Sequence, residues 1–93
     1  LFLLASTALA DGILRAPGME IRFLETPCIN EKVLKLIPPG APTPPKAALE
    51  TYEGKKFDGC WVRIPGQNVI FFIDEVGDAG LIPKNQIKWD VEV

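Results

Sequence analysis

The sequence contains no histidine and a single serine, Ser6. Ser-His-Asp and Cys-His mechanisms need an imidazole to accept the proton of the nucleophile near neutral pH, so hydrolases of those types are excluded. The chain has only two cysteines, whereas a structural zinc site uses about four Cys or His ligands and a thiol redox motif needs C-x-x-C. No G-K-[ST] phosphate-binding loop is present. We therefore expect neither enzyme activity, nor a metal, nor a cofactor.

The charges are nearly balanced, with 10 basic and 12 acidic residues. The basic residues are scattered along the chain and form no stripe, so we expect no binding to nucleic acid. A chain of 93 residues allows one domain. A domain of that size buries only roughly 60% of its unfolded surface, so a covalent staple would contribute substantially to its stability.

The first ten residues, L-F-L-L-A-S-T-A-L-A, are too short to span a bilayer but fit the end of a signal peptide. Ala8 and Ala10, followed by Asp11, match the A-x-A cleavage pattern. We interpret residues 1–10 as a signal-peptide remnant and residues 11–93 as one small domain, periplasmic or secreted, without a stable membrane anchor. The alternative is an N-terminal helix or strand buried in the domain.

In an exported protein, Cys28 and Cys60 lie in an oxidising compartment. We therefore expect them to form a disulfide. The two cysteines are 32 positions apart. A disulfide that closes a loop of this length lowers the entropy of the unfolded chain, which stabilises the fold by roughly 3.5 to 4 kcal/mol in the loop-entropy model. The alternative is a pair of buried free thiols.

The first half of the domain begins with an extended lead-in at residues 11–18. Residues 19–26 then alternate between apolar and polar side chains, which predicts a half-buried strand. Asn30 is a suitable N-cap for a short helix that follows it, because its side chain can accept hydrogen bonds from the free amides of the first turn.

A proline-rich segment follows at residues 38–45. Each proline lacks a backbone donor and has a fixed φ angle, so the segment is a stiff connector. Its Pro-x-x-Pro spacing is also that of SH3 ligands, the alternative to a plain linker. Pro45 suits the first turn of a helix at residues 46–52, with Gly54 as its end.

The second half of the domain contains most of the strand-forming residues. We predict a strand at residues 57–64, in which Trp61 is buried, a turn at 65–68 and a returning strand at 69–73. The returning run, V-I-F-F-I, has no polar face. It is either a central strand or an edge strand that meets a partner chain, and the latter would give a homodimer.

The end of the chain contains turns and short strands. The acidic segment 74–78 predicts a turn, residues 79–82 a short strand, residues 83–86 one helical turn, and residues 87–93 a terminal strand by their alternation. The three carboxylates of the acidic turn lack the spacing of a calcium-binding loop.

Residues 80–87, G-L-I-P-K-N-Q-I, resemble the end of an SH3-like barrel, where a G-x-x-P strand, one 3₁₀ turn and a last short strand follow in order. D-G-C-W at residues 58–61 resembles the strand that carries the SH3 tryptophan. Peptide-binding SH3 domains have N-Y-[VI] where this chain has N-Q-I, and they have an A-L-Y-D-Y segment that finds no equivalent before Cys28. The resemblance therefore implies the architecture and not a polyproline-binding site.

The order of motifs along the chain is also similar to that of small exported proteins of proteobacteria and their prophages. These motifs are a strand ending in T-P-C, then A-x-x-x-Y-x-G-K, then G-C-W, then D-x-x-G-D-x-G-x-I-P, over about residues 21 to 87. This resemblance implies a signal-bearing single domain with two cysteines. It implies no activity.

Taken together, these patterns predict a mainly β (α+β) domain: a small, curved antiparallel sheet of four or five strands in an SH3-like meander, with one or two short helices. We expect a non-enzymatic binding module of the bacterial cell envelope that meets a protein partner. The alternatives are an assembly subunit that self-associates through residues 69–73 and a small protein inhibitor. The residues predicted to contact a basic partner are Asp74, Glu75 and Asp78, with Phe72 adding an apolar contact if its side chain points outward.

Overall fold

The computed structural model describes residues 12–89. Seven strands, one α-helix and one 3₁₀ helix make up this part of the chain. In order they are β1 (Gly12–Ala16), β2 (Met19–Pro27), α1 (Glu31–Leu34), β3 (Lys46–Tyr52), β4 (Lys55–Arg63), β5 (Val69–Asp74), β6 (Ala79–Pro83), the 3₁₀ helix η2 (Lys84–Gln86) and β7 (Lys88–Trp89).

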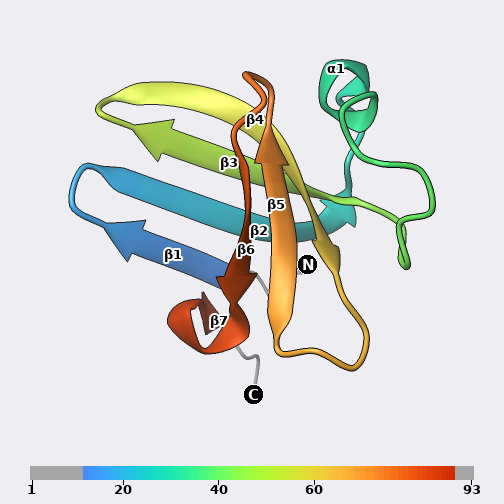
Figure 1. The fold of residues 1–93 in the computed structure, drawn as a ribbon. Coiled ribbons are helices and arrows are strands. Elements are labelled where there is room, and N and C mark those ends of the chain that lie inside the picture. The colour runs from blue at the N-terminus through green and yellow to red at the C-terminus, as the bar shows by residue number, and fades with distance from the viewer. Residues whose placement is uncertain (1–11, 90–93) are drawn as a thin grey trace, which may run out of the picture.

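The strands form one antiparallel sheet in the order β6-β5-β4-β3-β2-β1-β7. Strands β1 to β6 are a simple meander, and η2 then brings the chain back so that β7 pairs with β1, with Trp89 opposite Gly12. Figure 1 shows β5 and β6 crossing the direction of β1 to β3, so that the sheet curls into a half-barrel. Because of this curl, the sheet has a concave inner face that encloses a hydrophobic core. Apolar side chains on its outer face must be buried by another part of the chain.

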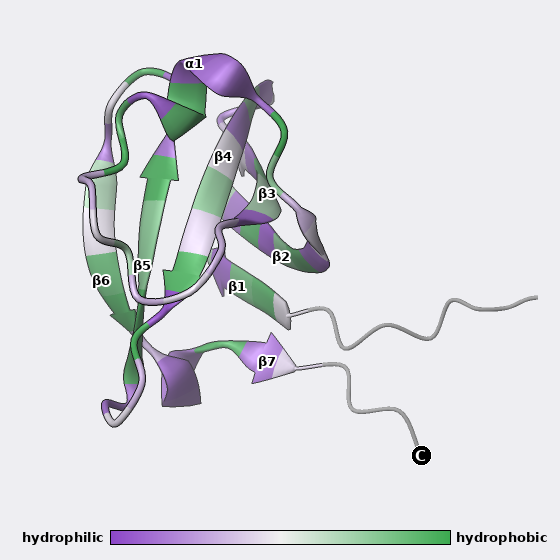
Figure 2. Ribbon diagram, turned by 90° about the vertical axis from the view of Figure 1, so that its right-hand side faces the viewer, coloured by the Kyte–Doolittle hydropathy of each residue, from purple (hydrophilic) through white to green (hydrophobic). Residues whose placement is uncertain are grey.

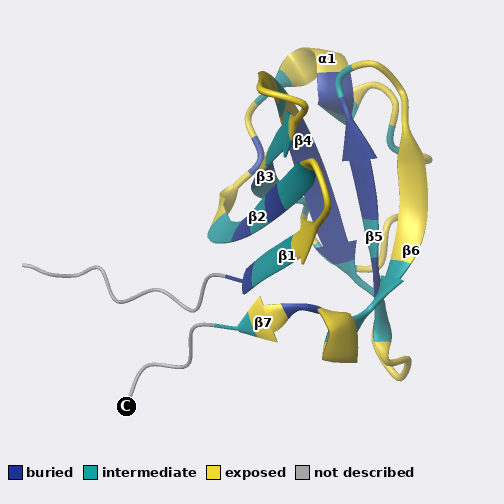
Figure 3. Ribbon diagram, turned by 90° about the vertical axis from the view of Figure 1, so that its left-hand side faces the viewer, coloured by how far each residue is buried: buried dark blue, intermediate teal, exposed yellow. Residues whose placement is uncertain are grey.

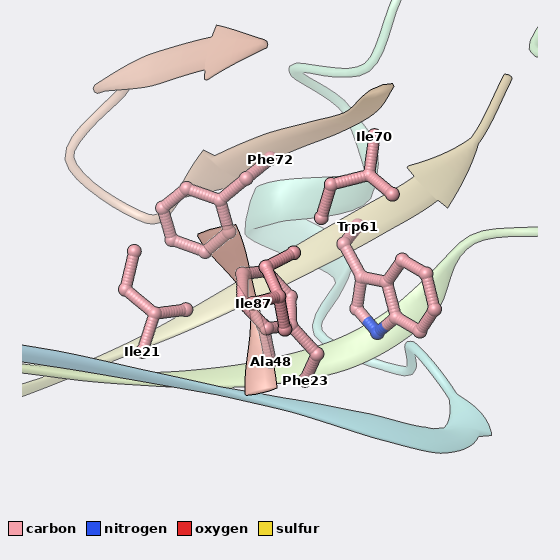
Figure 4. Close-up of a cluster of buried hydrophobic side chains, with 7 residues drawn as sticks. All are labelled: Ile21, Phe23, Ala48, Trp61, Ile70, Phe72 and Ile87. Carbon is pink, nitrogen blue, oxygen red and sulfur yellow. The ribbon is translucent and has the colours of Figure 1, made fainter. Parts of the chain in front are cut away.

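The inner face holds the larger hydrophobic core. Figure 4 shows its side chains converging from β2, β3, β4, β5 and the segment after η2. Trp61 and Phe23 are fully buried and meet edge to face, with ring centroids 5.7 Å apart. The expectation that Trp61 is buried in the core is therefore confirmed. The buried members of this cluster are Ile21, Phe23, Ala48, Trp61, Ile70, Phe72 and Ile87.

The outer face of β4 and β5 is covered in part by α1. Val33 of the helix is fully buried and packs with Cys28, Cys60 and Ile73 in a second, smaller cluster. Figure 2 shows the hydrophobic ribbon of β4 and β5 beneath α1, and Figure 3 shows the same strands largely buried while β6 is mostly exposed. The fold therefore has two small apolar layers, one on each side of β4 and β5.

Two features differ from the sequence-based expectations. Residues 46–52 form strand β3 where a helix was predicted, and the lead-in is a true strand, β1, so the sheet has seven strands where four or five were predicted. The turn Glu53-Gly54 has positive φ at both residues (50° and 83°), which is the conformation of a tight hairpin turn. Gly54 therefore closes the β3–β4 hairpin and does not end a helix.

The misassigned strand has a physical explanation. Ala, Leu and Glu are good helix formers, and Pro45 suits a first helical turn. Strand alternation along K-A-A-L-E-T-Y is hidden because Glu50, a charged residue, shares the inner face with buried Ala48. Pairing with β2 on one side and β4 on the other decides the conformation in spite of the local propensity.

Other expectations are confirmed. The strand predicted at residues 19–26, the 57–64 and 69–73 hairpin, the strand at 79–82 and the helical turn before residue 87 are all present. The run 69–73 lies in β5, which pairs with β4 on one edge and β6 on the other, so it is a central strand. Residues 1–10 and 90–93, on which the leader and most of the terminal strand were predicted, lie outside the described residues.

Candidate functional site

The disulfide between Cys28 and Cys60 fixes the segment before α1 to strand β4. Their Cα atoms are 5.6 Å apart, a distance typical of disulfides. The side chain of Asn30 caps α1 by accepting a hydrogen bond from the Val33 amide at 3.1 Å, as the sequence predicted. Because the helix has only four residues, its position depends on the disulfide and on Val33, not on its own stability.

The proline-rich segment after α1 is held at both ends. The Cys28 amide donates to the Pro45 carbonyl at 3.1 Å, and the Thr43 hydroxyl donates to the Arg63 carbonyl at 3.2 Å. At the start of the segment, the Ile37 amide donates to the Leu34 carbonyl at 3.3 Å. The Thr43 bond ties the segment to the end of β4. Residues 38–45 belong to neither a helix nor a strand, as expected of a proline-rich connector.

Between this segment and the outer face of β4 and β5 lies an apolar cleft of about 230 Å³. We call it the proline-loop cleft. Its floor is formed by half-buried Phe71 of β5, by Val62 of β4 and by Ile64, the residue that follows β4. All of its lining residues are apolar: Ile37, Pro38, Pro39, Gly40, Ala41, Pro42, Val62, Ile64 and Phe71. A cleft lined by no polar or titratable side chain can bind apolar groups but offers no side chain as a general acid or base.

The strand end beside the cleft is fixed by an ion pair. Arg63 donates to Glu25 of β2, at 2.7 Å for the shorter contact, and its guanidinium lies 4.7 Å from the centre of the Trp61 ring. Burial would raise the pKa of Glu25, but the hydrogen bond and charge of Arg63, with help from Lys46, outweigh it and hold that pKa below its usual value. These contacts join β2 to β4 and hold the backbone that accepts the Thr43 bond.

The residues predicted to contact a partner are not brought together on one surface. Phe72 is only 5% exposed and belongs to the inner core, so the condition that it point outward is not met. Asp74 is buried, and its Oδ1 accepts the amides of Val76 and Asp78, each at 3.0 Å. Its carboxylate therefore closes the turn and is not available to a partner. Glu75 is half-buried and Asp78 is exposed.

Sequence reasoning missed a carboxyl pair, formed by Glu50 and Asp74. Burial, the hydrogen bond that a protonated Glu50 can donate to Asp74, and the negative charges of Asp74 and Asp78 raise the pKa of Glu50 to about 7. Glu50 Oε1 is buried and has no hydrogen-bond partner among the described residues. A proton on Glu50 would relieve this, because the carboxyl could then donate to Asp74. Recognising β3 as a strand is what would have revealed Glu50 on the inner face.

A second cleft, of about 320 Å³, involves β2, β3 and β4 and is lined by charges of both signs. Its lining residues are Glu20, Arg22, Leu49, Glu50, Thr51, Lys56, Phe57, Asp58 and Glu75. Because the lining side chains carry both positive and negative charges, the cleft favours neither an anionic nor a cationic ligand. Within residues 12–89, no group of three or more Cys, Asp or Glu side chains is arranged to hold a metal ion.

Comparison with known proteins identifies no relative of this chain. The chain matches no protein-family model, no curated protein and no solved structure. Among the described residues, no helix is long and apolar enough to cross a membrane. The choice between the two clefts described above therefore depends on the chemistry of their linings, and the proline-loop cleft is the apolar one.

Proposed function

We propose that this chain is a non-enzymatic binding module of the bacterial cell envelope, and that it holds a protein partner in the proline-loop cleft. The observation that carries the proposal is the cleft itself, in which every lining residue is apolar. Exposed apolar clefts are typical of protein- and ligand-binding sites, because contact of apolar surface with water is unfavourable.

The size of the cleft indicates the type of ligand. Its volume of about 230 Å³ is below the range of roughly 300–1,000 Å³ that is usual for drug-sized ligands. It suits one or two apolar side chains of a peptide segment. The prolines of one wall have little conformational freedom to lose on binding, which lowers the entropic cost of association.

The Cys28–Cys60 disulfide supports the compartment that we propose, the periplasm or the extracellular space, since disulfides persist in oxidising environments. The same bond supports the function, because it fixes the start of the helix from which the proline-rich segment continues. The succession of β4, β5, β6, η2 and β7 has the strand and turn order on which the SH3-like interpretation rests. A small inhibitor would be a special case of this proposal, in which the partner is an enzyme.

The test uses peptides displayed on phage, selected against the oxidised protein. We expect selected peptides to share one or two apolar positions, and calorimetric titration should then give their affinities. Ile64→Glu places a charge on the cleft floor and should weaken binding by about tenfold or more. Leu49→Glu is the matched control, because Leu49 is 48% exposed on β3 and does not line the cleft.

Two results would contradict the proposal. One is a set of peptides that bind the Ile64→Glu variant as tightly as the original protein. The other is selection of peptides without apolar positions, which would point to the charged cleft of β2 to β4. A variant that lacks both cysteines offers a further check. If circular dichroism shows that it is folded, it should bind the peptides as weakly as Ile64→Glu does, because the disulfide no longer fixes the helix before the proline-rich segment.

A further inference from the structure

The outer edge of β6 carries an inference that is independent of the proline-loop cleft. β6 ends the strand order on one side, and among the described residues it pairs only with β5. Its sequence, A-G-L-I-P, contains no charged residue, and Leu81 is 62% exposed. Natural edge strands usually carry charges or bulges that prevent pairing with another chain. The only such feature of this strand is the proline at its end.

The hydrogen bonds to β5 determine which backbone groups face outward. The Asp74 amide donates to the Asp78 carbonyl and the Lys84 amide to the Asn68 carbonyl, each at 2.9 Å. In an antiparallel pair, the backbone groups of every second residue bond to the same neighbouring strand, so the N–H and C=O groups of residues 78, 80, 82 and 84 point towards β5. The backbone groups of Ala79, Leu81 and Pro83 therefore point the other way, to the open edge of the sheet.

We propose that β6 pairs antiparallel with the β6 strand of a second copy, with the two-fold axis at Leu81. In this register Leu81 exchanges two hydrogen bonds with Leu81 of the partner subunit. The Ala79 amide donates to the carbonyl of Pro83 of the partner subunit, and symmetry repeats that bond. Proline lacks only a donor, and here it is needed only as an acceptor.

Charge complementarity selects both this register and a second copy as the occupant. With Leu81 at the centre, exposed Asp78, the residue before β6, comes opposite Lys84 of the partner subunit, the residue after that strand. Opposite residues share a face of the sheet, and the symmetry produces two such ion pairs. A shift of the register by two residues would place Asp78 opposite Ile82 or Gln86 of the partner subunit, and neither residue is charged.

This pairing also relocates the homodimer through residues 69–73 that the sequence analysis gave as an alternative. That run is β5, whose two edges are already paired with β4 and β6. The adjacent strand, β6, has the free edge. The dimer would join two half-barrels through their β6 edges and would leave the proline-loop cleft, on the outer face of β4 and β5, to act separately.

The first test is sedimentation velocity of the full oxidised chain from low micromolar to millimolar concentration. We expect a reversible change from one copy to two, which high salt should weaken because exposed ion pairs are screened. Leu81→Lys should abolish the dimer, whereas Leu49→Lys, at an exposed position of a central strand, should dimerise like the original chain. A chain that stays monomeric throughout would overturn the proposal, and so would open-ended assembly, because a two-fold pairing closes at two copies.

The second test separates a second copy from an unrelated strand as the occupant. Asp78→Lys and Lys84→Asp should each weaken self-association by about tenfold or more, because two attractive pairs become repulsive. Mixing the two variants should restore association as a heterodimer, since the exchanged charges then face each other. Variants that dimerise alone as well as the original chain, or whose mixture does not associate, would overturn the register. Circular dichroism melting checks that both variants are folded.

Discussion

Replacing Glu50 by glutamine should stabilise the protein at pH 8 and remove one step from its stability profile. The raised pKa, from 4.5 to about 7, means that the folded state binds a proton that the unfolded state releases. Below about pH 4.5 the carboxyl is protonated in both states, so its full contribution to stability is present. As the pH rises towards 7 that contribution is lost, because the folded state must then ionise Glu50 beside Asp74.

The size of this effect follows from the shift and from the exposure of the side chain. At about 1.4 kcal/mol per pKa unit, a shift from 4.5 to about 7 corresponds to an upper limit of about 3.4 kcal/mol. Glu50 is only partly buried, so solvent screening reduces the expected loss of stability to about 1–2 kcal/mol. Glutamine keeps the shape and a donor for Asp74 but carries no charge, so the Glu50→Gln variant should not show this loss.

The assay is urea unfolding of the original chain and of the Glu50→Gln variant at several pH values between 4 and 8. We expect the free energy of unfolding of the variant to exceed that of the original chain at pH 8 and the two to converge near pH 4. Glu53→Gln is the control, because Glu53 is exposed in the adjoining hairpin turn. Equal stabilities at pH 8, or a difference that grows towards low pH, would refute the reasoning.

Three further predictions concern stability, each measured by urea unfolding. Trp61→Ala should cost about 3–5 kcal/mol, because it empties a fully buried site and leaves the Leu24 carbonyl without its 2.9 Å bond; an unchanged unfolding midpoint would contradict this. Reduction of the disulfide should lower the free energy of unfolding by about 2–5 kcal/mol. Non-reducing mass spectrometry of exported protein should show the Cys28–Cys60 link. Two free thiols in that protein would refute both the bond and the proposed compartment. Gly59→Ala should cost about 1–3 kcal/mol, because its new Cβ would lie 2.8 Å from the Ile73 carbonyl oxygen; Gly80→Ala, with open space around its Cβ position, should cost much less, and equal losses would be evidence against the crowding.

The sequence determined those features in which local physical chemistry leaves little choice. Alternation of apolar and polar side chains predicted β2, an N-cap side chain predicted the start of α1 at Asn30, and the prolines predicted a connector outside helix and sheet. The turn residues 65–68 between two runs of strand formers predicted the hairpin of β4 and β5. Compartment reasoning predicted the disulfide. Each of these depends on neighbours in the chain, or on the number of cysteines, and not on distant contacts.

Only the tertiary structure decided the rest, because it depends on which segments pair across the sheet. β3 has the local propensity of a helix, and its pairing with β2 and β4 makes it a strand and places Glu50 beside Asp74. The pairing of β5 with β4 puts Phe72 in the core and turns the Asp74 carboxylate inward, so the predicted acidic contact surface is reduced to Glu75 and Asp78. The proline-loop cleft and the free edge of β6 are created by long-range contacts, and no local pattern in the sequence reports a contact between residues far apart along the chain.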